Sequence, residues 1–199
     1  MIKIPLINKL GKNEINDTIT KINRSIDKPR DNFIQQAQSG RVAFKMLLTD
    51  DKDNIKIEGL DFQQYSYTLN LYVENNAAVT AYYHLYCGED MTPANYYSYG
   101  IYSWGGVIFA INGAAPYITT ANANQFAFAS ATINVSQKGK YCYVSHSIVS
   151  NLPFIVSGHG INRNPSATSL HLISSNSATG GTSVAGFGRD SRIILLAEG

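Results

Sequence analysis

Charged side chains are scarce over most of this chain. They make up 15% of its 199 residues, whereas about a quarter is usual for a globular protein. No charged residue occurs between Met91 and Gln137, and positions 63–199 hold only five basic and five acidic residues. The formal net charge is +2, so the sequence lacks the basic excess of nucleic-acid-binding proteins and gives no electrostatic reason to expect an anionic membrane as a partner.

Long apolar runs are also missing. No stretch reaches the roughly 20 apolar residues that a transmembrane helix requires. The first residues, MIKIPLINKLGKNE, lack the continuous apolar core and the small-residue cleavage site of a secretory signal. We therefore expect no membrane insertion and no export by the standard secretory route.

Metal-ligating residues are few and do not follow a ligand spacing. The two cysteines, Cys87 and Cys142, lie in strand-like stretches, and we expect buried free thiols, with a disulfide as the open alternative. No CxxC or HxH spacing accompanies them, and the four histidines are widely separated. The sequence thus predicts no metal site and no cofactor.

Catalytic motifs are absent as well. A glycosidase needs two placed carboxylates, but few acidic residues follow Asp61: Glu74, Glu89, Asp90, Asp190 and Glu198. No GxSxG elbow surrounds Ser145–His146, and the chain has no P-loop or dinucleotide-binding fingerprint. We predict that the protein has no catalytic residues and is not an enzyme.

The charged residues that are present gather in the first part of the chain, where two elements are predicted. Residues 1–12 read as an extended docking peptide, with a frayed terminus as the alternative. Residues 13–27 read as a helix whose isoleucines recur at spacings of four, three and four. These isoleucines are Ile15, Ile19, Ile22 and Ile26. Isoleucine at both core positions of a heptad favours trimers or tetramers.

A two-heptad helix with one narrow apolar stripe is marginal as an isolated helix. It has to be buried against partner chains or against its own domain, and we predict self-association, with intrachain packing as the alternative. Residues 1–40 are therefore assigned to an N-terminal anchor and helical stem, and residues 41–199 to a separate β domain.

The β domain shows a period of two from about residue 65 onward, which indicates strands. The predicted strands are Ser66–Glu74, Ala78–Cys87, Gly105–Asn112, Gln125–Asn134, Gly139–Ser147, Leu152–Val156, Ser169–Ser174 and Ser191–Ala197. The predicted turns are Asn112–Gly113, Lys138–Gly139, Gly158–His159–Gly160, Asn164–Pro165 and Gly180–Gly181. Short strands at this spacing, with no helical period between them, predict a mainly β fold: a β-sandwich of jelly-roll type.

Tyrosine is the most distinctive residue type, with 13 copies. One cluster lies in the charge-free segment and forms the candidate binding set: Tyr96, Tyr97, Tyr99, Tyr102 and Trp104. Tyrosine combines a large apolar ring with a polar tip, which suits protein interfaces and the faces of sugar rings. The alternative is that these rings pack across strands inside the sheets.

The combination of docking peptide, isoleucine-rich helix and charge-poor β domain resembles bacteriophage virion fibre, head-fibre and capsid-decoration proteins. Ser174–Ser183 (SSNSATGGTS) followed by Arg192–Leu196 (RIILL) looks like the glycine- and serine-rich loop and the last apolar strand of such knobs. The likeness covers the layout of the whole chain and depends on no specific motif.

The resemblance implies a structural virion protein: a homotrimeric head or tail fibre, or a decoration protein, that displays a β knob for host attachment. It further implies that residues 1–12 bind capsid or tail proteins, that the knob binds a host-surface glycan, and that the virion is assembled in the host cytoplasm. The alternative function is a monomeric carbohydrate-binding, lectin-like module, which needs an exposed aromatic platform on the same scaffold.

Overall fold

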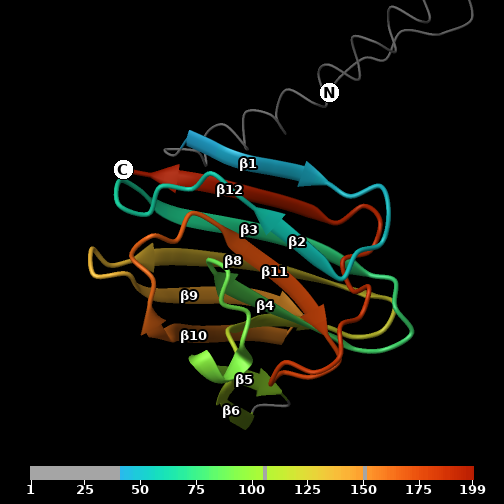
Figure 1. Cartoon of the computed structure of the whole chain (residues 1–199). Helices are drawn as coiled ribbons and strands as arrows, with labels where there is room; N and C mark the ends of the chain where they lie inside the picture. Colours follow the sequence, from blue (N-terminus) through green and yellow to red (C-terminus); the bar gives the residue numbers. More distant parts are fainter. Residues whose placement is uncertain (1–40, 105–106, 150–151) are drawn as a thin grey trace, which may run out of the picture. The chain divides into compact units, whose positions relative to one another are not determined.

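The computed structural model describes residues 41–104, 107–149 and 152–199 (Figure 1). The predicted anchor, the helical stem and the four stem isoleucines lie outside the described residues. These isoleucines are Ile15, Ile19, Ile22 and Ile26.

The described residues form two sheets in which every neighbouring pair of strands is antiparallel. The larger sheet has the order β1 (Arg41–Leu47), β12 (Arg192–Glu198), β3 (Ser66–Asn75), β8 (Gln125–Val135), β9 (Lys140–Val149), β10 (Leu152–Arg163), β5 (Tyr96–Trp104) and β6 (Val107–Ala114). The smaller sheet has the order β2 (Asn54–Ile57), β11 (Leu170–Ser175), β4 (Ala81–Cys87) and β7 (Tyr117–Ala121). The prediction of a mainly β fold is confirmed, and the two sheets are consistent with a β-sandwich, with β2, β11 and β4 lying over the larger sheet (Figure 1).

The core lies between the sheets, and strand β3 shows how the sequence builds it. Its residues alternate between half-buried and buried along the whole strand, so that one face points to the core and the other outward. Inward Leu71 is paired with Ala129 on β8, and inward Leu69 with Ala131. Large residues on β3 thus face small ones on β8, which leaves room for side chains from the second sheet to interdigitate.

Hydroxyl groups on β9 connect the two sheets across this core. Tyr141 donates its hydroxyl to the carbonyl oxygen of Leu85 at 2.9 Å, and Tyr143 donates to that of Tyr117 at 2.6 Å. Both tyrosines are buried, and both acceptors belong to the smaller sheet. Part of the high tyrosine content is therefore structural, because each ring fills the core and each hydroxyl satisfies a buried carbonyl.

Two of the predicted turns are strand residues instead. Asn112–Gly113 lies in β6 and Gly158–His159–Gly160 lies in β10, so both turn predictions are wrong. The physical reason at Gly158 is the ring of Tyr143, which is its partner on β9: a Cβ at Gly158 would lie 2.4 Å from the Tyr143 hydroxyl oxygen. This glycine makes room for a neighbouring aromatic ring rather than bending the chain.

Candidate binding surface

The aromatic cluster forms strand β5, where no strand was predicted. Strand alternation divides the predicted binding residues between two faces. Tyr97 and Tyr99 lie on the outer face of the larger sheet, whereas Tyr96 and Tyr102 point to the opposite face. The side chain of Trp104 lies outside the described part of the chain.

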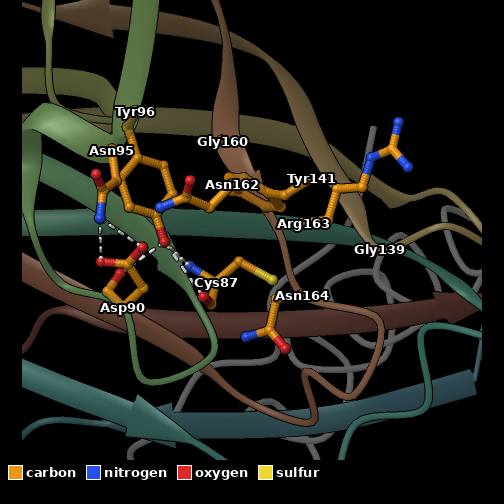
Figure 2. Close-up of a pocket in the computed structure, with 10 residues that line it drawn as sticks. All are labelled: Cys87, Asp90, Asn95, Tyr96, Gly139, Tyr141, Gly160, Asn162, Arg163 and Asn164. Carbon is orange, nitrogen blue, oxygen red and sulfur yellow. Dashed lines mark hydrogen bonds between the residues drawn. The ribbon is translucent and has the colours of Figure 1, made fainter.

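Tyr96 is only 3% exposed, so its ring is not open to a ligand at the surface. Its hydroxyl donates to the backbone oxygen of Asp90 at 2.6 Å and accepts a bond from the backbone N–H of Cys87 at 3.2 Å (Figure 2). The ring packs edge-on against Tyr86, with centroids 5.1 Å apart. Burial raises the pKa of the Tyr96 phenol. Tyr96 thus anchors the start of β5 to the end of β4.

Tyr102 is half-buried and stacks on Phe154 of the neighbouring strand β10. The ring centroids lie 5.0 Å apart and the planes are 12° from parallel. This is the cross-strand packing that was the alternative for the aromatic set. Tyr102 therefore contributes to the sheet rather than to an open platform.

Tyr97 and Tyr99 form an aromatic pair on the outer face. Their rings meet edge-to-face at a centroid distance of 4.7 Å, and Tyr97 also lies 6.1 Å from the ring of His159 on β10. Tyr99 is 56% exposed. The hydrogen bond between the two hydroxyls raises the pKa of Tyr97. Of the predicted set, these are the two residues that the structure brings together at the surface.

A shallow hollow of about 310 Å³ opens beside Tyr99 on strands β5, β6 and β10. Its floor and walls combine apolar and small polar side chains. These are Tyr99, Ile101, Ala110, Asn112, Ile155 and Ser157. An aromatic ring next to an amide and a hydroxyl is a combination that suits a neutral, hydroxyl-rich ligand.

The hollow belongs to a wider apolar surface, which we call the outer apolar face. In the described residues, nine of the thirteen exposed large apolar side chains belong to strands β5, β6, β8, β9 and β10. Ile161 follows the register irregularity of β10 beyond His159, and the other eight define the face: Tyr99, Ile101, Ile108, Phe126, Phe128, Val144, Ile148 and Ile155. Sequence reasoning predicted only Tyr99, although the alternation within β8 and β9 does mark these positions as outward.

A second, smaller cavity of about 130 Å³ lies where β4, β5, β9 and β10 meet, beside Cys87 and Asp90 (Figure 2). The Asp90 carboxylate accepts bonds from the Asn95 amide at 2.9 and 3.1 Å and from the backbone N–H of Thr92 at 3.1 Å. Partial burial acts to raise the pKa of Asp90, but these hydrogen bonds outweigh it, and the pKa lies below its usual value. The carboxylate holds a turn in place.

The buried histidine of β4 also has a structural environment. His84 Nε2 lies 3.0 Å from the Ser175 hydroxyl and 3.1 Å from the Ser177 carbonyl oxygen. Burial lowers its pKa to about 4 despite the Ser177 carbonyl, which acts to raise it. His84 is consequently neutral at physiological pH and belongs to the packing of the smaller sheet.

The two cysteines are both free, with Cys87 buried and Cys142 exposed; the prediction of burial is thus right for Cys87 and wrong for Cys142. In the described ranges, His, Cys, Asp and Glu side chains form no group of three or more that would hold a metal ion. Among the same residues, no helix is long and apolar enough to cross a membrane.

The fold and this surface define a class: a mainly β protein of two antiparallel sheets that presents an uncharged apolar and aromatic face. Comparison with protein-family models, with curated proteins and with solved structures gave no match to this chain. The case for function therefore depends on the residues themselves.

Proposed function

We propose that this protein is a structural component of a bacteriophage virion: a homotrimeric head or tail fibre, or a decoration protein, that displays its β domain on the particle. In this proposal the protein is not an enzyme, and it acts through its surfaces. The single observation that carries the proposal is the outer apolar face, a broad uncharged surface on a sandwich scaffold.

The strand order supports a jelly-roll winding of the sandwich. If the hairpin β5–β6 and the added strands β9 and β10 are set aside, the sheets read β1-β12-β3-β8 and β2-β11-β4-β7. The chain then passes from one sheet to the other at each step except between β4 and β7, which are neighbours in the smaller sheet. Jelly rolls occur in viral capsid and lectin domains, and both insertions extend the sheet that carries the outer apolar face.

The apolar face supports a role in assembly or attachment. Monomeric soluble proteins rarely leave large contiguous apolar patches in water, and such patches mark interaction sites. Here the exposed positions include Ile108, which is 73% exposed, and Ile148, which is 51% exposed. Side chains of this size at such exposure indicate that the face is covered in the functional state.

The trimer and the anchor rest on sequence features. Burying the four stem isoleucines would stabilise an assembly by about 1.5–3 kcal/mol for each side chain, less the cost of ordering and association. Residues 1–12 would then bind capsid or tail proteins, and the knob would contact a host-surface glycan.

Immunolabelling tests the proposed location. An antibody against the β domain should decorate phage particles released by lysis of the host that carries the gene, as seen by electron microscopy. Particles from a phage with the gene deleted serve as the control. Purified particles that carry no label and no peptide of this chain by mass spectrometry would contradict the proposal.

Sedimentation equilibrium of the full chain tests the trimer. The chain of 21.8 kDa should behave as a species of three times that mass. Ile19→Asn combined with Ile22→Asn should weaken the assembly, because asparagine removes the apolar stripe. A monomeric unmodified chain would count against the trimer.

A lectin-like module is the second candidate, and the Tyr97–Tyr99 pair beside the hollow favours it. Asn112 and Ser157 line the hollow with groups that can bond to sugar hydroxyls. Under this view, Tyr97→Ala with Tyr99→Ala should abolish retention on a glycan array, whereas Tyr65→Ala should retain it. An array on which the unmodified chain binds no glycan would dismiss the module.

A further inference from the structure

The outer apolar face spans five adjacent strands, with His146 of β9 between its apolar groups and opposite Ile155. Ile101 on β5 lies opposite Ile155 on β10 and opposite Ala110 on β6. Farther along the sheet, Phe128 on β8 lies opposite Ile148 on β9. Directly opposed side chains have Cβ atoms about 5 Å apart, so these positions form one surface rather than scattered exposed residues.

The dimensions of this face match those of a protein interface. Five strands spaced by about 4.8 Å, each with about nine residues rising about 3.4 Å, cover roughly 700 Å² in projection. A standard interface buries about 800 Å² on each partner. The face is large enough to hold a partner protein and is far larger than a small ligand needs.

The absence of charge on the face indicates what kind of partner covers it. In the described residues it carries no carboxylate, and its two basic residues, Lys140 on β9 and Arg163 on β10, stand opposite each other at one end. Charged residues return beyond it, on β3 and β12, where Glu74 and Arg192 lie. A strongly acidic or basic partner would find no counter-charge here. The β6 strand of a second copy is also uncharged and would meet this face without opposing like charges.

The edge strand β6 supports the same conclusion. Proteins usually protect a sheet edge with charged side chains, proline or a covering element. Strand β1 carries Arg41 and Lys45, β2 carries Lys56, and β7 is buried at all five positions. Strand β6 has no charged residue and no proline in its sequence, VIFAINGA. An unprotected edge of this kind is compatible with solubility when a closed assembly covers it.

We propose that the outer apolar face, with the β6 edge at its margin, is the contact surface between copies of this chain. This inference rests on the proposed function, in which copies assemble, and it assigns assembly to the β domain in addition to the stem. The occupant of the face is the β6 margin of a second copy, in a head-to-tail contact of the kind that closes a trimer.

The test compares two double variants of the full chain by sedimentation equilibrium. Ile101→Asp with Ile155→Asp places two carboxylates at the centre of the face, and the apparent dissociation constant should rise at least about tenfold. Val79→Asp with Met91→Asp is the matched control, because both residues are exposed apolar positions outside the strands of either sheet. The control should assemble like the unmodified chain. Circular dichroism and thermal unfolding establish that each variant is folded.

Three outcomes would overturn the inference: a monomeric unmodified chain, a face variant that assembles normally, or a control that weakens assembly equally. If Ile108→Lys is used in place of a face variant that fails to fold, the same criteria apply. The stem variant Ile19→Asn/Ile22→Asn separates the two proposals. Loss of assembly in the stem variant alone would reject the face and leave the fibre proposal standing. Unlabelled virions together with a dissociated face variant would reject the fibre proposal and leave the face as the contact between copies.

Discussion

At the scale of single residues, the hydroxyl of Tyr143 joins the two sheets through the Tyr117 carbonyl. Tyr143→Phe keeps the ring but leaves this buried carbonyl without its donor, and we expect a loss of about 1–3 kcal/mol in the free energy of unfolding. Urea unfolding measures this loss. Tyr99→Phe is the control, since an exposed hydroxyl should change stability by less than about 0.5 kcal/mol. Equal effects in the two variants would contradict the role assigned to Tyr143.

His84 predicts how stability depends on pH. Its pKa is about 4 in the folded chain, because burial disfavours the charged ring, whereas the ordinary pKa of histidine is 6.5. Below about pH 6.5 the His84 ring is protonated in the unfolded chain but stays neutral in the folded chain. The free energy of unfolding therefore falls as the pH drops from 6.5 toward 4. The loss is on the order of 3 kcal/mol.

Urea unfolding at a series of pH values across this window measures that slope. His84→Gln removes the titrating ring, so its unfolding free energy should fall less steeply over the same range. If the slope is unchanged in the variant, His84 does not cause it.

At the scale of strands, β10 contains a glycine that its neighbour requires. A Cβ at Gly158 would lie 2.4 Å from the hydroxyl oxygen of Tyr143, whereas a Cβ at Gly160 would lie 3.6 Å from its nearest atom. Tyr143 is held by its own hydrogen bond and cannot move aside without losing it. Gly158→Ala should therefore destabilise the fold by about 1–3 kcal/mol.

Gly160→Ala, two residues along the same strand, should be nearly neutral and serves as the control. Thermal unfolding of the two variants decides the matter. A stable Gly158→Ala protein would mean that the Tyr143 ring has more freedom than the structure shows.

The strands also show which features a sequence can reveal. Strand β3 was predictable, because its outward face is partly exposed to solvent and its polar and apolar residues alternate without a break. Strand β10 was predicted only in part, since Gly158 and Gly160 resemble a turn until the ring on β9 is known. The same limit applies to the binding surface: Ile101 and Ile155 become neighbours only through the strand order, which local patterns do not contain.

At the scale of the whole molecule, the last strand of the described residues is an internal one. Strand β12 lies between β1 and β3 and contributes the fully buried Ile193 and Leu195. A chain that ends at Ser191 would lose this core and expose the edges of both neighbours. We expect it to show no cooperative unfolding transition by circular dichroism.

Removal of Glu198 and Gly199 alone is the control, because both are exposed and the buried residues of β12 remain. This shorter truncation should unfold cooperatively, close to the unmodified chain. A cooperative transition in the chain that ends at Ser191 would show that the sandwich closes without its last strand.

The pairing of Arg41 with Ala197 has a practical consequence for building with this protein. The β domain starts and finishes at one corner, so a fluorescent protein or peptide fused after Gly199 would emerge beside the point where the preceding forty residues join. Cargo meant to stand clear of that junction belongs in a loop on the far side, such as the segment between β3 and β4. A short linker that joins Gly199 to Arg41 would also allow the β domain to be made as a circular permutant, with new termini in another loop.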